Sequence, residues 1–168
     1  RKGEKLQSLI HGGGQEKNLR AGTENIPGIA GFGLASQIAS ENMEANIRHS
    51  GSLKDQFLKG LDDMKIDHRV NGADPLPGFV NMTLPGVHGN DLVINLDMEG
   101  IAISAGSACS SGSAKPSKIL TEIGLSDKEA LETVRISFGR FNTEEDIQIL
   151  IRTLESILSR SREMKNAG

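Results

Sequence analysis

Apolar residues recur at every third or fourth position in two long segments of this sequence, and that spacing places them on one face of a helix. The first segment starts after Asn25, which can cap a helix, and Pro27 falls in the first turn, where proline is tolerated. Gly51 can bend or break this helix. The second segment starts after Thr143. We predict two long helices that bury one face each. Their apolar faces comprise Ile29, Phe32, Ala35, Ile38, Ala39, Met43, Ile47, Phe57, Leu58, Leu61 and Met64 in the first, and Ile147, Leu150, Ile151, Leu154, Ile157 and Leu158 in the second.

Three short segments between these helices have the pattern of strands. Residues 79–84 lie between Pro-Gly turn signals, and residues 101–103 form a short apolar run. Residues 134–138 alternate apolar and polar side chains, which is typical of a half-buried strand. The sequence therefore predicts a sheet of few strands.

Short helices are predicted around these strands. Residues 91–99 and 116–124 have helical patterns, and Ser126 and Glu129 have the spacing of a capping box. The order of elements predicts an α/β or α+β domain, in which helices pack on a few-stranded sheet.

Length and charge restrict the class of protein and its partners. A chain of 168 residues fits one domain with a core of its own. The net charge of −3 gives no reason to expect nucleic acid or anionic lipid as a partner, and no apolar run is long enough for a membrane helix. One cysteine excludes an intrachain disulfide. We therefore expect a reducing compartment, the cytoplasm.

Cys109 is the first candidate for chemistry. It lies in a loop predicted for residues 104–113, in which every side chain is small. A structural cysteine usually packs among apolar groups, and this segment offers none that can cover it. An exposed thiol of this kind is suited to a chemical role. The residues alone leave open that Cys109 is an incidental loop cysteine.

Arg135 is the second candidate. It lies between Val134 and Ile136 in the predicted strand, so it faces away from the core if those two face inward. Its planar guanidinium matches a carboxylate with two hydrogen bonds. An exposed strand residue or a structural ion pair is the open alternative.

The third candidate is the glycine-rich segment from His11 to Thr23. Backbone N–H groups of consecutive glycines can approach an anion such as phosphate, and the Thr23 hydroxyl can add a donor. The segment matches neither a dinucleotide-binding fingerprint nor a P-loop, so a plain loop is also possible. The histidines have no metal-ligand spacing with one another or with Cys109, and no metal site is expected.

Three segments carry a family resemblance. They read His-Gly-Gly-Gly-Gln-Glu at 11–16 with Leu-Arg-Ala-Gly-Thr-Glu-Asn at 19–25, Ser-Ala-Gly-Ser-Ala-Cys-Ser-Ser-Gly at 104–112 with Pro-Ser at 116–117, and Val-Arg-Ile-Ser-Phe-Gly-Arg-Phe at 134–141 with Thr-Glu-Glu at 143–145. Together, in this order, they resemble the cysteine desulfurases, the pyridoxal-phosphate enzymes that supply sulfur for iron–sulfur clusters. The likeness covers essentially the whole chain, and the long Gly/Ser loop is similar to the NifS/IscS-like branch.

The resemblance implies a fold, a reaction and three site residues. The fold is the C-terminal domain of a fold-type I pyridoxal-phosphate-dependent transferase. The reaction removes sulfur from L-cysteine, which gives L-alanine and an enzyme-bound persulfide for a sulfur-acceptor protein such as an iron–sulfur scaffold. Cys109 matches the nucleophile, and Arg135 matches the residue that holds the substrate carboxylate. Thr23 matches a residue that reaches the cofactor phosphate of the other subunit in a homodimer.

The chain also departs from the family. Lys2 and Lys5 lack the glycine-flanked context of the cofactor-binding lysine, which in the family precedes the His-Gly-Gly-Gly segment. Because the chain begins with Arg1 rather than methionine, we expect a C-terminal portion that is inactive and binds no pyridoxal phosphate on its own. Residues 1–25 are then the glycine-rich end of the large domain. Residues 26–168 are the small domain, with the catalytic-cysteine loop at about 104–115.

Two other functions stay open at this point. A non-catalytic module can present Cys109 as a sulfur acceptor or a redox sensor. Another pyridoxal-phosphate enzyme, such as an aminotransferase, is the second alternative. The loop cysteine disfavours it, because transamination needs no nucleophilic thiol.

Overall fold

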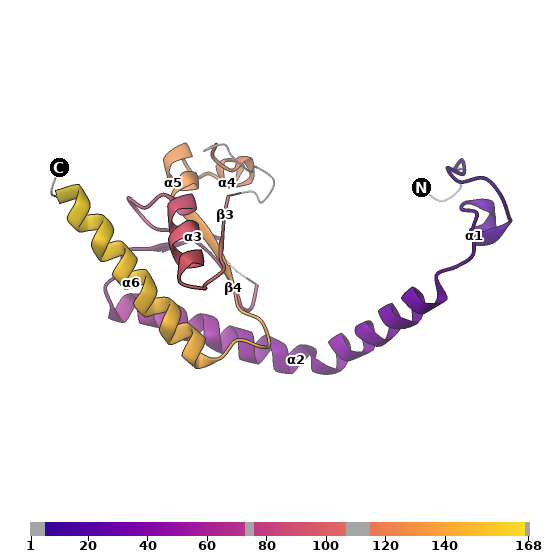
Figure 1. The fold of residues 1–168 in the computed structure, drawn as a ribbon, viewed down its shortest axis with the longest axis horizontal. Helices are drawn as coiled ribbons and strands as arrows, with labels where there is room; N and C mark the ends of the chain where they lie inside the picture. Colours follow the sequence, from indigo (N-terminus) through magenta and orange to yellow (C-terminus); the bar gives the residue numbers. More distant parts are fainter. Residues whose placement is uncertain (1–5, 73–75, 107–114, 167–168) are drawn as a thin grey trace. The chain divides into compact units, whose positions relative to one another are not determined.

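The computed structural model describes residues 6–72, 76–106 and 115–166, and contacts divide the chain into two units, Arg1–Met43 and Glu44–Gly168. The first unit contains α1 (Gln15–Asn18) and the beginning of α2 (Ile26–Asp63) (Figure 1). The side-chain Oδ1 of Asn25 accepts a hydrogen bond from the Gly28 N–H at 3.1 Å, which confirms the predicted cap. Helix α2 runs without a break through Gly51, so the alternative of an interruption there was wrong.

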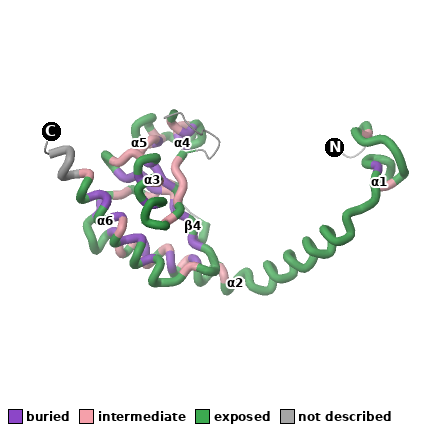
Figure 2. The backbone as a smooth tube through the Cα atoms, viewed as in Figure 1, coloured by how far each residue is buried: buried purple, intermediate pink, exposed green. Residues whose placement is uncertain are grey.

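The apolar face of α2 differs between the two units. In the second unit, Phe57 and Leu61 are fully buried, as predicted, and Leu58 packs partly buried against the core. The prediction was wrong for Ile47 and Met64, which are 45% and 37% exposed, and it missed Leu53, which is buried. In the first unit, Ile29 is 58% exposed and Phe32 is 76% exposed, and Ala21 is the only described apolar residue that is buried (Figure 2).

The second unit is built on a four-stranded antiparallel sheet. Its order is β1 (Arg69–Val70), β2 (Phe79–Thr83), β4 (Thr133–Ser137) and β3 (Ser104–Ala105). Strands β2 and β4 were predicted. The strand predicted at residues 101–103 was wrong, because the chain pairs with β4 only from Ser104 onward. Strand β1 has only two residues and no alternation that the sequence could reveal.

One face of the sheet is covered by helices and forms the core. Val80 lies opposite Ile136 and Met82 opposite Val134, and all four are buried. They belong to one cluster with apolar residues of α2, α3 (Gly89–Met98) and α6 (Glu144–Asn166). Within this cluster the Phe57 and Phe138 rings lie 5.5 Å apart between centroids. The predicted apolar face of the last helix is confirmed, since all six of its residues are buried.

Two short helices, α4 (Lys118–Glu122) and α5 (Asp127–Leu131), precede β4. The predicted capping box of α5 is present, because the Glu129 N–H donates to the Ser126 hydroxyl and the Glu129 carboxylate accepts from the Ser126 N–H. The Glu129 carboxylate also pairs with Arg69 of β1, with 2.8 Å between Oε1 and Nη1. Helix α5 is thereby tied to the edge of the sheet. Of the helices in the described ranges, none combines the length and apolar character that crossing a membrane requires.

Gly78 is required where the chain enters β2, and its replacement tests this. It has a φ of +69°, and a Cβ there would lie 2.5 Å from the Ser50 Cβ and 2.8 Å from the Phe138 carbonyl oxygen. We expect Gly78→Ala to lower the free energy of unfolding by about 3 kcal/mol or more, from both backbone strain and the close approach. Gly100→Ala is the matched control, because its φ of +77° is similar and nothing lies within 4 Å. Gly100→Ala should lower the free energy of unfolding by only about 1–2 kcal/mol. Equal losses in urea unfolding would contradict this account.

The Glu129 contacts predict a dependence of stability on pH. Hydrogen bonds from the Ser126 hydroxyl and N–H, together with the Arg69 charge, hold the pKa of Glu129 below its ordinary value of 4.5. A carboxylate whose pKa is lowered by folding stabilises the folded state fully above its unfolded pKa, and this contribution is lost as the pH falls through the folded pKa. We expect the free energy of unfolding of Glu129→Gln to fall less steeply than that of the parent below about pH 5. Glu155→Gln, an exposed change on α6, should keep the parent slope; a shared slope for all three proteins would refute the prediction.

Candidate functional site

Arg135 lies at the centre of the sheet face that the helices leave open. Its cross-strand partners are Asn81 on β2 and Ser104 on β3. Val134 and Ile136 are buried and Arg135 is exposed, so the predicted orientation of Arg135 away from the core is confirmed. Among the described residues, no acceptor takes a hydrogen bond or ion pair from its guanidinium. A guanidinium of this kind can bind an anion through two parallel hydrogen bonds.

Polar residues surround Arg135 on this face, which we call the open face. Two rows cross the strands, and they consist of Asn71, Asn81, Arg135 and Ser104 in the first and of Arg69, Thr83 and Thr133 in the second. Asn71 joins the first row because its N–H donates to the Asn81 carbonyl oxygen at 2.8 Å, directly after β1. In the second row, Thr83 and Thr133 are covered, at 3% and 1% exposed, whereas Arg69 is exposed.

The side chains of Asn81 and Arg135 lie close together across β2 and β4. The N–H of Phe138 donates to the Gly78 carbonyl and that of Leu84 to the Glu132 carbonyl. Because backbone hydrogen bonds between antiparallel strands recur at every second residue, those between β2 and β4 are made by the even-numbered residues of β2. Asn81 and Arg135 are therefore a pair that exchanges no backbone hydrogen bonds. In such pairs the Cα atoms are about 4.5 Å apart and the side chains are closer than in hydrogen-bonded pairs.

Sequence reasoning missed Asn71 and Asn81. The alternation in residues 79–84 places Asn81 and Thr83 on one face and Val80 and Met82 on the other. This signal was present in the sequence. Which residue of another strand lies opposite Asn81 depends on the register, and the pattern of one strand does not give it.

Ser104, the cross-strand partner of Arg135 on β3, lies in the described segment that precedes Cys109 in the sequence. Ser104 donates to the Arg135 carbonyl oxygen at 3.5 Å, and Ala105 packs beside Gly89 at the start of α3. The first two residues of the predicted loop are thus strand β3. Cys109 itself lies outside the described residues and follows Ser104 by five positions in the sequence.

Thr23 lies in the first unit, exposed, after a glycine in the left-handed region. Gly22 has a φ of +108°; its N–H donates to Gln15 Oε1 at 3.3 Å, and its carbonyl accepts from Arg20 Nη1 at 3.2 Å. The Gly22 N–H and one N–H of Arg20 are thus used within the segment. The Thr23 hydroxyl and the other N–H groups of Arg20 are donors of the type that fits the phosphate end of a pyridoxal phosphate. Thr23 and Arg135 belong to different units and are described separately.

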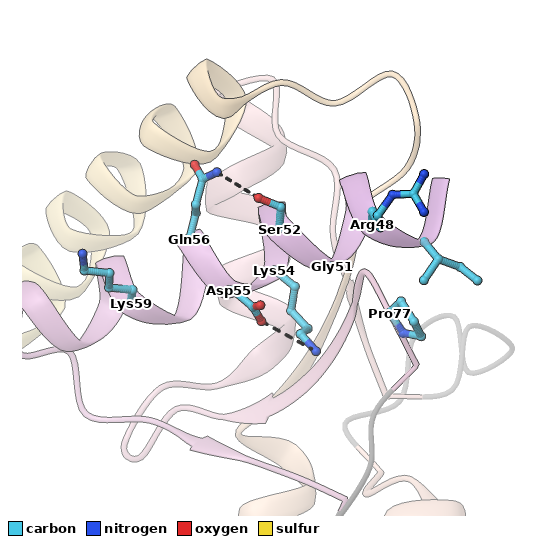
Figure 3. Close-up of a pocket in the computed structure, with 9 residues that line it drawn as sticks. Arg48, Gly51, Ser52, Lys54, Asp55, Gln56, Lys59 and Pro77 are labelled. Carbon is cyan, nitrogen blue, oxygen red and sulfur yellow. Dashed lines mark hydrogen bonds and ion pairs between the residues drawn. The ribbon is translucent and has the colours of Figure 1, made fainter. Parts of the chain in front are cut away.

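A hollow of about 720 Å³ lies along α2 and contains none of the three predicted site residues (Figure 3). Arg48, Lys54 and Lys59 give it a basic lining, together with Asp55, whose Oδ1 is 3.9 Å from Lys54 Nζ. It is open and lies apart from the sheet face that carries Arg135. Within the described ranges, no group of three or more His, Cys, Asp or Glu side chains is arranged to hold a metal ion.

Comparison with known proteins places this chain in a family. Residues 5–150 match the family described as Aminotransferase class-V. A curated relative, "Cysteine desulfurase IscS" of Clostridium botulinum, is 42% identical over 166 residues, which are 96% of this chain and 42% of that protein. The chain thus spans less than half the length of the curated relatives that it matches.

Solved structures agree with the sequence comparison. The NifS-like protein from Rickettsia africae ESF-5 has a TM-score of 0.77 at 32% identity, over 93% of this chain and 41% of that one. A structure described as SspA in complex with cysteine has a TM-score of 0.52 at 34% identity, over 82% of this chain and 37% of that one. The family match over residues 5–150, supported by these relatives, shows that this chain belongs to the aminotransferase class-V family.

Proposed function

We propose that this chain is the C-terminal portion of a cysteine desulfurase, which converts L-cysteine into L-alanine and a persulfide on Cys109. The observation that carries the proposal is the guanidinium of Arg135 at the centre of the open face, which has no partner among the described residues and lies beside β3, the strand that precedes Cys109 in the sequence. The likeness to cysteine desulfurases over 96% of the chain supports it.

Arg135 binds the carboxylate of the substrate. Its two parallel N–H groups match the two carboxylate oxygens, and this fixes the amino acid in position and in rotation. The scaffold is rigid, because β4 is paired on both sides and its neighbours Val134 and Ile136 are buried. A side chain on such a strand is held more accurately than one on a loop.

Cys109 accepts the sulfur atom. Its thiolate attacks the substrate sulfur, so that an S–S bond forms while the C–S bond of the substrate breaks. The carbon fragment takes up a proton in place of the sulfur and leaves as alanine. Atoms and electrons balance without an external oxidant, and the persulfide can pass its outer sulfur to an acceptor such as an iron–sulfur scaffold protein.

Pyridoxal phosphate supplies an electron sink that weakens the C–S bond when it is bound in the complete enzyme. From this chain, Thr23 would hold its phosphate across the subunit boundary of a homodimer. Residues 1–25 then belong to the large domain and residues 26–168 to the small one. The lysine that binds the cofactor lies in a segment that precedes this chain, and the enzyme works in the cytoplasm.

The nucleophile can be tested in the complete enzyme by Cys109→Ser. A hydroxyl keeps the size of the side chain but is not ionised near neutral pH, so we expect alanine formation from L-cysteine to fall by about 100-fold or more. Mass spectrometry after one turnover should find an added sulfur atom on Cys109 of the parent and none on the variant. Undiminished alanine formation would remove Cys109 from this role.

Because the proposed cofactor-binding lysine lies outside residues 1–168, we predict that these residues alone do not bind pyridoxal phosphate or release sulfide from L-cysteine. Purified chain mixed with pyridoxal phosphate should show no visible absorbance band of a bound cofactor, and added L-cysteine should release no sulfide above a protein-free control. Sulfide release that depends on Cys109 in this chain alone would contradict the division.

A further inference from the structure

A network of side-chain hydrogen bonds on the open face ends at Asn81, beside Arg135. Asn71 Nδ2 lies 2.9 Å from Asn81 Oδ1 and 3.0 Å from Thr83 Oγ1. Thr83 Oγ1 lies 2.8 Å from Thr133 Oγ1, which lies 2.7 Å from the Glu129 carbonyl oxygen. These contacts connect α5, β4, β2 and the end of β1 on the face opposite the core.

The contact with Glu129 fixes which group donates and which accepts in each of these hydrogen bonds, because a carbonyl oxygen can only accept. Thr133 has a single hydroxyl hydrogen and gives it to that oxygen. The contact between the two threonine hydroxyls therefore uses the hydrogen of Thr83. A longer contact of 3.4 Å from Thr83 Oγ1 to Asn71 Oδ1 competes for this hydrogen and is the weaker one. Thr83 Oγ1 accordingly accepts from Asn71, whose NH₂ group faces it.

The orientation of the Asn81 amide follows from that of Asn71. The same NH₂ group of Asn71 faces Asn81, which must therefore present its oxygen. The reverse orientation of both amides would take the Thr83 hydrogen and leave the 2.8 Å contact with Thr133 without one. Because Asn71 and Arg135 flank Asn81 on opposite sides, the NH₂ group of Asn81 lies on the Arg135 side. Within the described part of the chain nothing accepts from it.

We propose that Asn81 is a second binding residue for the substrate carboxylate, with Asn71 as the positioning residue that turns its NH₂ group toward the site. This inference rests on the proposed role of Arg135. A carboxylate accepts more hydrogen bonds than one guanidinium supplies, so a neutral donor beside Arg135 adds to binding. An amide does so without pairing with Arg135, whereas an acidic residue there would occupy the guanidinium.

The test is Asn81→Asp in the complete desulfurase. Aspartate keeps the size of the side chain and an oxygen for Asn71, but replaces the donor by a charged acceptor. We expect KM for L-cysteine to rise about 10- to 100-fold while kcat changes less than about threefold. Asn81→Ala, which adds no charge, should raise KM about 5- to 10-fold. Asn90→Asp, the same charge change at an exposed residue of α3, should leave both constants unchanged.

Inhibitors separate carboxylate binding from a structural effect. The inhibition constant of L-alanine should rise with KM in Asn81→Asp. That of ethylamine, which is alanine without its carboxylate, should change less than about threefold. Equal weakening of both inhibitors, or a fall in kcat at unchanged KM, overturns the proposal.

Arg135→Gln in the same enzyme separates the proposed role of Asn81 from that of Arg135. A raised KM for Arg135→Gln together with unchanged values for both Asn81 variants overturns the role of Asn81 and leaves that of Arg135. An unchanged KM for Arg135→Gln overturns the proposed role of Arg135, and that of Asn81 with it.

Discussion

The register between β2 and β4 is the constraint on which the rest of the structure depends. Val80 opposite Ile136 and Met82 opposite Val134 all point into the core. A shift by one residue would turn these side chains to solvent and Arg135 toward the helices. Burial of an unpaired arginine costs several kcal/mol, so the apolar residues and the charged one enforce the same pairing. The interaction that builds the core is thus the one that exposes the guanidinium.

Helices on a single side leave the other side of the sheet for binding, which antiparallel sheets permit. At one end, α5 closes this face through the Arg69–Glu129 ion pair and the hydrogen bond from Thr133. The rest stays open around Arg135. In the proposed function the two parts have different tasks: the closed end orders a network of hydrogen bonds, and the open end presents Asn81 and Arg135 to the substrate carboxylate.

The strongest local patterns of the sequence predicted their elements correctly. The two long helices, the Ser126 capping box and the strands around Val80 and Val134 follow from periodicity and turn residues. Strands β1 and β3 could not be placed in this way, because a two-residue strand is defined by its partner's hydrogen bonds. For the same reason Asn81 was not singled out. Gly51 interrupts nothing, since a glycine inside a helix lowers its stability without forcing a bend.

The proposed roles of Cys109, Arg135 and Thr23 come from the resemblance to a family rather than from physical reasoning. The residues alone justified only a small exposed thiol, an arginine facing away from the core and a segment with anion-binding donors. The structure adds the surroundings of Arg135, which depend on strands distant in sequence. It also shows the Arg20 guanidinium donating to the carbonyl oxygen of Gly22, the residue before Thr23.

The position of β3 and the short length of chain that follows it limit how far the Cys109 thiol can lie from Arg135. It holds Ser104 against Arg135 and Ala105 against α3, so the segment that follows starts from a fixed point. Five residues extend at most roughly 18 Å, and a thiol confined to a sphere of that radius has a mean concentration on the order of tens of millimolar. For the proposed reaction, two residues of strand are therefore enough to keep the Cys109 thiol at a high local concentration around a substrate bound to Arg135.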